Sequence, residues 1–424
     1  MSYIKNIIKP GAITLLASAM TMAIATSPSY AEHHGSGDGF YDALTGGKVS
    51  FSARVRYESV EQDNALKDAD ALTLRTTLGY KTGAFHGFTG FVEFEDVSDL
   101  GSDDYNSTTN GNTAYSVIAD PEGTEVNQAF LGYQFGANEI KFGRQEITFR
   151  NAPFHRFVGN VLWRQNHQSY DGLRFTTKAV PDTQFDYAYI NQINTIFGDD
   201  RNTPNGLIED GDIDVSGHLF NVKYTGLPMG TVSAYAQLID YKDVEAFSNK
   251  IIGARLNGAK AVNDDLKIMY TAELAMQDDY KDGTTEDHNY YLAEVGAKYK
   301  GWLAKVSHEV QEGDGTSSFK TRLGTNHAYQ GWADQFLTTP ATGLEDTYVT
   351  VIGKVLGAKL VVVYHDFETD EGGLDAGEEL DILLAKKFAK HYTVGLKYAD
   401  YDAGDAAVGK VDTEKVWVFG QVNF

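Results

Sequence analysis

Arginine side chains crowd one stretch of the sequence. Between positions 141 and 178 there are seven basic residues against two acids, in a chain whose formal net charge is −23. The guanidinium group stays protonated at physiological pH, and its planar fork binds carboxylates and phosphates through two hydrogen bonds. This pattern predicts contact with anions. The arginines in the stretch are Arg144, Arg150, Arg156, Arg164 and Arg174, and Arg54, Arg56, Arg75 and Arg255 on other segments extend the candidate path.

A second interpretation of these arginines stays open. They can neutralise acids on neighbouring segments and stiffen the structure without contacting a solute. The acids available for this are Glu58, Glu93, Glu95, Glu273, Glu294 and Glu309. The arginine-rich stretch also carries apolar residues from Phe149 to Trp163, so it has surface to bury and is expected to fold inward rather than extend into solvent.

An aromatic block from Tyr329 to Phe336 offers a different chemistry. Tyr329, Trp332 and Phe336 can stack on sugar rings, with His327 beside them to bond hydroxyl groups. The alternative is that the same rings pack a long loop into a lid, because a loop of roughly thirty residues needs a small core to stay ordered. Both interpretations are compatible with the sequence.

Signals of catalysis are weak. The chain has no cysteine and no Gly-x-Ser-x-Gly motif, and His308, His327 and His365 have no partner at a spacing typical of a catalytic triad. Acidic clusters occur in several predicted loops, but their spacing does not match a calcium-binding loop. We therefore expect no enzyme activity, no cofactor and no defined metal site.

The elements that position these residues are strands. In 48–60 the residues Val49, Phe51, Ala53, Val55 and Tyr57 alternate with Ser50, Ser52, Arg54, Arg56 and Glu58, and similar runs recur to the end of the chain. Each run is about 10 residues long, as a tilted membrane-crossing strand requires, and about eighteen runs can be counted. The connections between them alternate between short and long. This pattern predicts an all-β fold, a transmembrane antiparallel β-barrel with short periplasmic turns and long extracellular loops.

The two ends of the chain indicate its location. Lys5 and Lys9, an apolar stretch from 12 to 25, and Ser29-Tyr30-Ala31 fit a cleaved signal peptide over residues 1–31, followed by a short lead over 32–46 and the barrel over 47–424. The last strand ends in Phe424, the kind of terminus that the outer-membrane insertion machinery handles. We expect a place in the bacterial outer membrane, in contact with its lipid and lipopolysaccharide.

The chain resembles a known family in two blocks. Gly143-Arg144-Gln145, Arg156-Phe157-Val158-Gly159, Trp163-Arg164-Gln165 and Tyr170-Asp171-Gly172 form the first, and residues 325–336 form the second. They are similar to the alginate-export family of outer-membrane barrels. The resemblance implies a barrel of about eighteen strands whose lumen arginines, above all Arg144, Arg156 and Arg164, offer a path to a polyuronate.

Together these observations predict a passive outer-membrane channel for anionic or saccharide solutes. A general porin with little selectivity and a barrel that acts as an anchor or adhesin through its acidic outer loops are the alternatives. The net charge of −23 excludes nucleic acid as a partner.

Overall fold

A single closed sheet dominates the computed structural model, which describes residues 39–198, 211–284 and 287–424. The signal peptide predicted for residues 1–31, and the lead as far as residue 38, lie outside the described residues. The strands are β1 (Lys48–Gln62), β2 (Ala69–Lys81), β3 (Phe88–Asp99), β4 (Gly123–Phe135), β5 (Asn138–Gln145), β6 (Ser169–Thr177), β7 (Thr183–Asn194), β8 (Asp212–Leu227), β9 (Gly230–Tyr241), β10 (Asn249–Ala261), β11 (Leu266–Asp279), β12 (His288–Tyr299), β13 (Trp302–Gln311), β14 (Leu344–Val355), β15 (Ala358–Glu368), β16 (Asp375–Phe388), β17 (Tyr392–Asp402) and β18 (Thr413–Asn423). The described helical segments are α2 (Phe40–Thr45), η2 (Glu245–Phe247) and η3 (Ala406–Val408).

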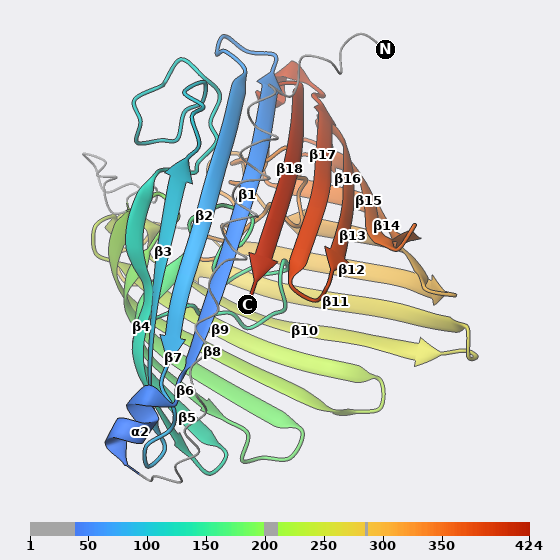
Figure 1. The fold of residues 1–424 in the computed structure, drawn as a ribbon. Helices are drawn as coiled ribbons and strands as arrows, with labels where there is room; N and C mark the ends of the chain where they lie inside the picture. Colours follow the sequence, from blue (N-terminus) through green and yellow to red (C-terminus); the bar gives the residue numbers. More distant parts are fainter. Residues whose placement is uncertain (1–38, 199–210, 285–286) are drawn as a thin grey trace.

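The sheet closes on itself between its first and last strands. Each strand pairs antiparallel with its neighbour in sequence, and β1 pairs with both β2 and β18 (Figure 1). The register along the closing pair runs from Ser52 opposite Asn423 to Gln62 opposite Thr413. Closure leaves no strand edge unpaired, which a sheet surrounded by lipid requires. The predicted fold class, an antiparallel barrel of eighteen strands, is confirmed.

Short connections lie at one end of the barrel and the longest connections at the other. At one end the turns are short, and two of them place consecutive residues at positive φ: Lys300 (47°) with Gly301 (89°), and Leu356 (50°) with Gly357 (78°). These are two-residue hairpin turns whose twist suits antiparallel strands. At the other end the connections include 100–122, 146–168 and 312–343. By the rule for such barrels, the short-turn end is periplasmic and the long-loop end extracellular.

The two faces of the wall differ in polarity as the alternation predicts. Outward-facing Leu78, Leu274 and Val295 are 53%, 61% and 59% exposed, whereas inward-facing Glu58 and Glu273 are each 1% exposed. An apolar outer face suits lipid, and a polar inner face suits a lumen. In the described part of the chain, no helix is long and apolar enough to cross a membrane.

The last residue is held at the barrel's closing pair. The backbone N–H of Phe424 donates to the carbonyl of Phe51 at 2.8 Å, and the N–H of Phe51 donates to the carbonyl of Phe424 at 3.2 Å. The Phe424 ring lies on the outside of the wall and is 54% exposed.

Candidate functional site

Two long loops fill much of the lumen. We call residues 146–168 the first inner loop and residues 312–343 the second inner loop. Residues of both loops contact inward-facing carboxylates on β1, β11, β13 and β16, so both loops fold into the barrel. The first inner loop thus lies where the sequence predicts.

Arg164 fastens the first inner loop to β1. Its guanidinium donates to Glu58 at 2.6 Å and to Asp120 of the loop 100–122 at 3.1 Å, and all three side chains are at most 3% exposed. Burial of these charges is tolerable because each one has an opposite partner and hydrogen bonds. Arg164 therefore acts as a structural clamp between a strand and two loops.

Arginines of the wall hold the loop backbone in return. Arg54 donates to the carbonyl of Leu162 at 3.0 Å, to the carbonyl of Arg164 and to the side chain of Gln165 at 2.8 Å. Arg56 donates to the carbonyl of Trp163 and pairs with Glu58 and Asp120. These bonds satisfy carbonyls that the irregular loop leaves without partners.

Arg156 and Arg150 fasten the same loop to the opposite side of the wall. Arg156 pairs with Glu309 of β13, and both side chains are fully buried. Arg150 pairs with Glu273 of β11, which also accepts from Arg255 of β10 at 2.5 Å. The loop thus spans the lumen between two carboxylate anchors.

The remaining inward arginines are paired as well. Arg75 donates to Glu95 at 2.6 Å, and Arg174 donates to Asp186 at 2.8 Å. Of the nine arginines in the predicted path, Arg54 alone has no described carboxylate within ion-pair distance. These contacts are the ones expected if the arginines neutralise acids on neighbouring segments and stiffen the structure.

Arg144 lies on the other side of the wall. It stands opposite Ala129 and Asp171 in the ladder, two pairs beyond Phe142, which stands opposite Leu131. Phe142 and Leu131 are 64% and 63% exposed on the lipid side, so the period of two places Arg144 on that side too. Its ion pair with Asp171, at 2.8 Å, is an outer-surface contact, which differs from the lumen position expected.

We therefore expect Arg144→Gln to leave ion selectivity unchanged. The side chain is separated from the lumen by the wall, so its charge acts on permeating ions only through the low-dielectric sheet. Reversal potentials of the variant and the wild type in a salt gradient measure this. A shift toward cation preference would show that Arg144 faces the channel.

The aromatic residues of the second inner loop are mostly buried in the protein. Phe336 packs against Phe367 and Tyr401 of the wall, with ring centroids 4.8 and 5.9 Å apart, and is 0% exposed. The Tyr329 hydroxyl donates to the carbonyl of Phe154 at 3.0 Å. Trp332 is only partly buried and lies over the ammonium of Lys397 at 4.1 Å. These contacts are the ones expected if the rings pack the long loop together rather than stack on sugar rings.

His327 joins the two inner loops. Its ring stacks on Trp163 with centroids 3.9 Å apart and planes 4° apart, and Trp163 donates to the Thr325 hydroxyl at 3.1 Å. Nδ1 lies 2.5 Å from a carboxylate oxygen of Asp334, and Nε2 faces Lys397. Burial lowers the pKa of His327 to about 3, so the ring is neutral, with Nδ1–H donating and Nε2 accepting.

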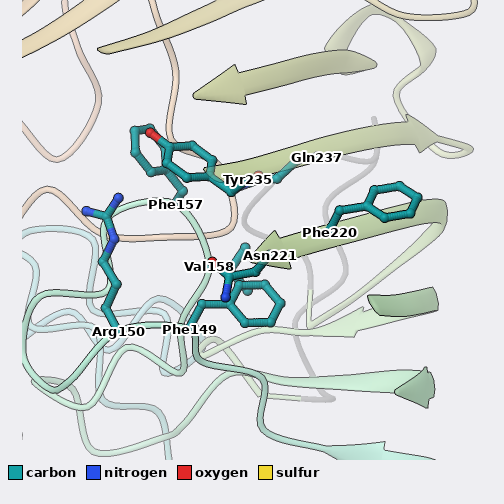
Figure 2. Close-up of a pocket in the computed structure, with 8 residues that line it drawn as sticks. All are labelled: Phe149, Arg150, Phe157, Val158, Phe220, Asn221, Tyr235 and Gln237. Carbon is teal, nitrogen blue, oxygen red and sulfur yellow. The ribbon is translucent and has the colours of Figure 1, made fainter. Parts of the chain in front are cut away.

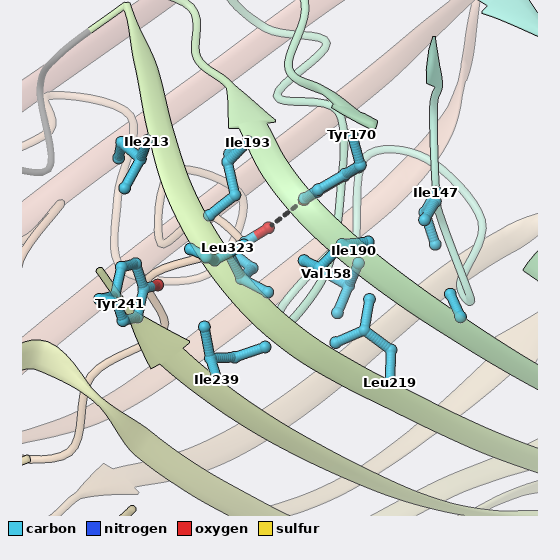
Figure 3. Close-up of a cluster of buried hydrophobic side chains, with 12 residues drawn as sticks. Ile147, Val158, Tyr170, Ile190, Ile193, Ile213, Leu219, Ile239, Tyr241 and Leu323 are labelled. Atoms are coloured by element: carbon cyan, nitrogen blue, oxygen red, sulfur yellow. Dashed lines mark hydrogen bonds between the residues drawn. The ribbon is translucent and has the colours of Figure 1, made fainter. Parts of the chain in front are cut away.

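An apolar cluster binds both inner loops to the wall between β7 and β9. Val158 of the first loop and Leu323 of the second pack against Ile190, Leu219 and Ile239 (Figure 3). The Tyr170 hydroxyl donates to the carbonyl of Leu323 at 3.1 Å. This packing leaves little space. A cavity of about 20 Å³, room for one water molecule, is lined by Phe149, Phe157 and Val158 of the first inner loop and by Asn221 and Tyr235 of the wall (Figure 2).

Two cations of the second inner loop have no acidic partner among the residues that the structure describes. Lys320 and Arg322 are half-buried, and neither forms an ion pair with a described carboxylate. Lys320 donates to the carbonyl of Thr339, while the Arg322 guanidinium lies 4.0 Å over the ring of Phe247. Burial lowers the pKa of Lys320 to about 8, and the nearby charge of Arg322 adds to the effect.

Lysines surround the lumen at the short-turn end. Side chains alternate between the two faces of a strand, so counting from the buried residues that face the lumen places eight exposed lysines on the inner face. None of them forms an ion pair with a described carboxylate. Three pairs stand directly opposite each other on adjacent strands: Lys48 with Lys81, Lys267 with Lys298, and Lys354 with Lys359. We call the eight the lysine ring: Lys48, Lys81, Lys223, Lys267, Lys298, Lys354, Lys359 and Lys387.

Sequence reasoning missed the lysine ring, although a signal was present. Each of its lysines lies within a few residues of a short turn and on the polar side of an alternating run. The arginine-rich stretch is continuous in sequence, whereas the ring is assembled from eight strands, each of which contributes one lysine.

Solved structures of outer-membrane porins have the same architecture. OccAB4 of Acinetobacter baumannii matches with a TM-score of 0.68 and 13% identity, over 89% of this chain and 98% of that one. OpdK of Pseudomonas aeruginosa, determined with vanillate, matches with a TM-score of 0.67 and 12% identity, over 90% and 99%. OccD3 (OpdP) of the same organism matches with a TM-score of 0.66 and 13% identity, over 90% and 92%.

The fold is that of an outer-membrane porin. Porins of this architecture lie in the outer membrane of Gram-negative bacteria, in agreement with the location expected from the sequence. No protein-family model and no curated protein sequence matches the chain. The resemblance of this chain's sequence to the alginate-export family of porins therefore stays a prediction.

Proposed function

We propose that the protein is a passive outer-membrane channel that favours anionic solutes. The observation that carries this proposal is the lysine ring, a set of exposed cations on the inner wall that form no ion pair with a carboxylate in the described part of the chain. The porin fold supports the channel itself.

Electrostatics gives the ring its effect. Like charges directly opposite each other on neighbouring strands destabilise a sheet. The three opposed lysine pairs therefore lower the stability of the barrel, and a role in stabilising the wall does not account for them. A narrow passage lined by one sign of charge, with low-dielectric walls, raises the local concentration of counter-ions. The ring therefore attracts anions and repels cations at the periplasmic end of the lumen.

The arginines have a different role in this proposal. Because the inward arginines of the predicted path other than Arg54 are paired with carboxylates, their charges are largely neutralised. They shape the passage by holding the inner loops in place. Lys320 and Arg322, which have no ion pair with a described carboxylate, provide positive charge on the second inner loop and extend the favourable potential toward the extracellular end.

Acidic saccharides are the solute class that we propose, with uronate monomers or oligomers as its members. The likeness of residues 325–336 and of the blocks between 143 and 172 to the alginate-export family supports a uronate. The vanillate in the OpdK structure is a carboxylate too, bound to a protein of the same fold. A channel needs no catalytic residues, so we infer that the protein is not an enzyme.

Liposome swelling with two sugars of the same size tests the proposal. Proteoliposomes are diluted into isotonic galactose or sodium galacturonate, which differ by a carboxylate, and the initial swelling rates are compared. We expect faster entry of galacturonate, with the preference reduced in a variant in which the lysines are replaced by glutamine. Equal rates for the two sugars would favour a general porin, and no swelling with either sugar would favour an anchor or adhesin.

A further inference from the structure

The short helix α2 carries an apolar face that no described residue covers. Phe40, Tyr41 and Leu44 are 60%, 74% and 42% exposed, and they lie within one turn and a half of helix. Three large apolar side chains at this spacing are costly in water.

The helix is tied to the outer side of the wall. The hydroxyl of Tyr80, an outward-facing residue near the periplasmic end of β2, donates to the carbonyl of Leu44 and accepts from the N–H of Gly47 at 3.2 Å. The N–H of Gly83 in the β2–β3 turn donates to the carbonyl of Ala43 at 2.8 Å. These bonds fix α2 at the lower rim of the barrel, beside β2 and β3 (Figure 1).

Aromatic rings continue from the helix along the same rim. Phe40 meets Phe85 edge to face at 5.6 Å. Next along the rim, outward-facing Phe88 stacks on Tyr133 at 4.4 Å, and Tyr133 stacks on Phe135 at 5.4 Å. Phe88 and Phe135 are 53% and 38% exposed. The apolar face of α2 is therefore continuous with the band of aromatic residues that meets the membrane interface.

We propose that α2 lies in the headgroup layer of the inner leaflet and that phospholipid covers Phe40, Tyr41 and Leu44. An amphipathic segment with aromatic residues settles at this depth, with its rings at the boundary between headgroups and acyl chains. The helix then anchors the N-terminal end of the barrel to the membrane surface. This inference uses the barrel's orientation but not its solute preference, so it stands apart from the proposed function.

Fluorescence quenching at a single labelled cysteine tests the proposal. The chain contains no cysteine, so Tyr41→Cys gives one reactive site for an environment-sensitive dye. Leu274→Cys on the lipid face is the control for lipid contact, and Asp264→Cys in the exposed periplasmic turn between β10 and β11 is the control for water. Each labelled protein is folded into phosphatidylcholine vesicles that contain spin-labelled lipid or are exposed to iodide.

The dye at position 41 is expected to be quenched by lipid spin-labelled near the headgroup several-fold more than the dye at position 264, and several-fold less by iodide. Quenching by iodide equal to that at position 264, with none by lipid, would overturn the proposal. So would protection from both quenchers, because it would show that another protein surface or a second copy of the chain covers the helix.

A second variant separates helix docking from barrel folding. Tyr80→Phe removes the hydroxyl that holds the end of α2 but keeps the ring in the wall. We expect the lipid quenching at position 41 to fall while the barrel keeps its folded mobility on an unheated gel. If quenching is unchanged, the Tyr80 hydroxyl does not hold the helix at the interface, and the docking of α2 through this hydroxyl is wrong.

Discussion

Replacing the six lysines of the three opposed pairs with glutamate is expected to invert the channel's ion preference. The sites are Lys48, Lys81, Lys267, Lys298, Lys354 and Lys359. The substitution makes six of the ring's eight charges negative, so the net charge of the ring and the local potential change sign. The ratio of chloride to potassium permeability should fall by roughly ten-fold or more, as a change of about 1.4 kcal/mol in the relative barrier produces. Reversal potentials in planar bilayers measure the ratio.

Two controls accompany this variant. Glutamine at the same six positions should give an intermediate preference, because it removes charge without reversing it. Lys386→Glu changes a lysine on the outward face, next to Lys387 of the ring, and should leave the ratio unchanged. An unaltered ratio in the six-glutamate variant would show that selectivity is set elsewhere, for example by the acidic extracellular loops.

Removing the Arg156 side-chain charge is expected to release the inner loops. Arg156 is fully buried, pairs with Glu309, and donates to Asn326 and Gln330 at 3.0 and 2.7 Å. Arg156→Met leaves the Glu309 carboxylate buried without its partner, which typically costs about 3–5 kcal/mol. The same change cuts two of the bonds between the first and second inner loops. We expect a lower melting temperature of the folded barrel and a larger single-channel conductance, as the loops leave the lumen.

The double variant Arg156→Met with Glu309→Gln separates the two effects. It removes the buried charge of Glu309, so it should recover much of the lost thermal stability. The bonds to Asn326 and Gln330 stay broken, so the conductance should remain above that of the wild type. A wild-type conductance and melting temperature in Arg156→Met would mean that the two loops are held by their apolar contacts alone.

Much of the fold follows from short-range patterns in the sequence. The alternation in residues 48–60 and the switch between short and long connections depend only on a period of two and on turn residues, and both are found in the structure. The inward direction of the first inner loop was also predictable, because a stretch with Phe149, Phe157 and Trp163 needs burial.

The pairing inside the lumen could not be predicted in the same way. Glu309 lies 153 residues from Arg156, and Glu58 lies 106 residues from Arg164. Their meeting depends on how two irregular loops cross the barrel, which no local pattern encodes. The position of Arg144 is a different case: Lys141 and Arg144 are an odd number of residues apart on one strand, so they face opposite sides. Counting along β5 would have placed Arg144 outside.

We propose that positive charge on the inner wall outweighs the chain's net charge of −23 in selecting which ions pass. The most direct test is the reversal potential of the wild-type channel across a planar bilayer with a ten-fold gradient of potassium chloride. The lysine ring predicts a potential whose sign corresponds to chloride preference, and a smaller magnitude at high salt, where screening weakens the ring. A potential of the opposite sign, corresponding to potassium preference, would contradict the claim.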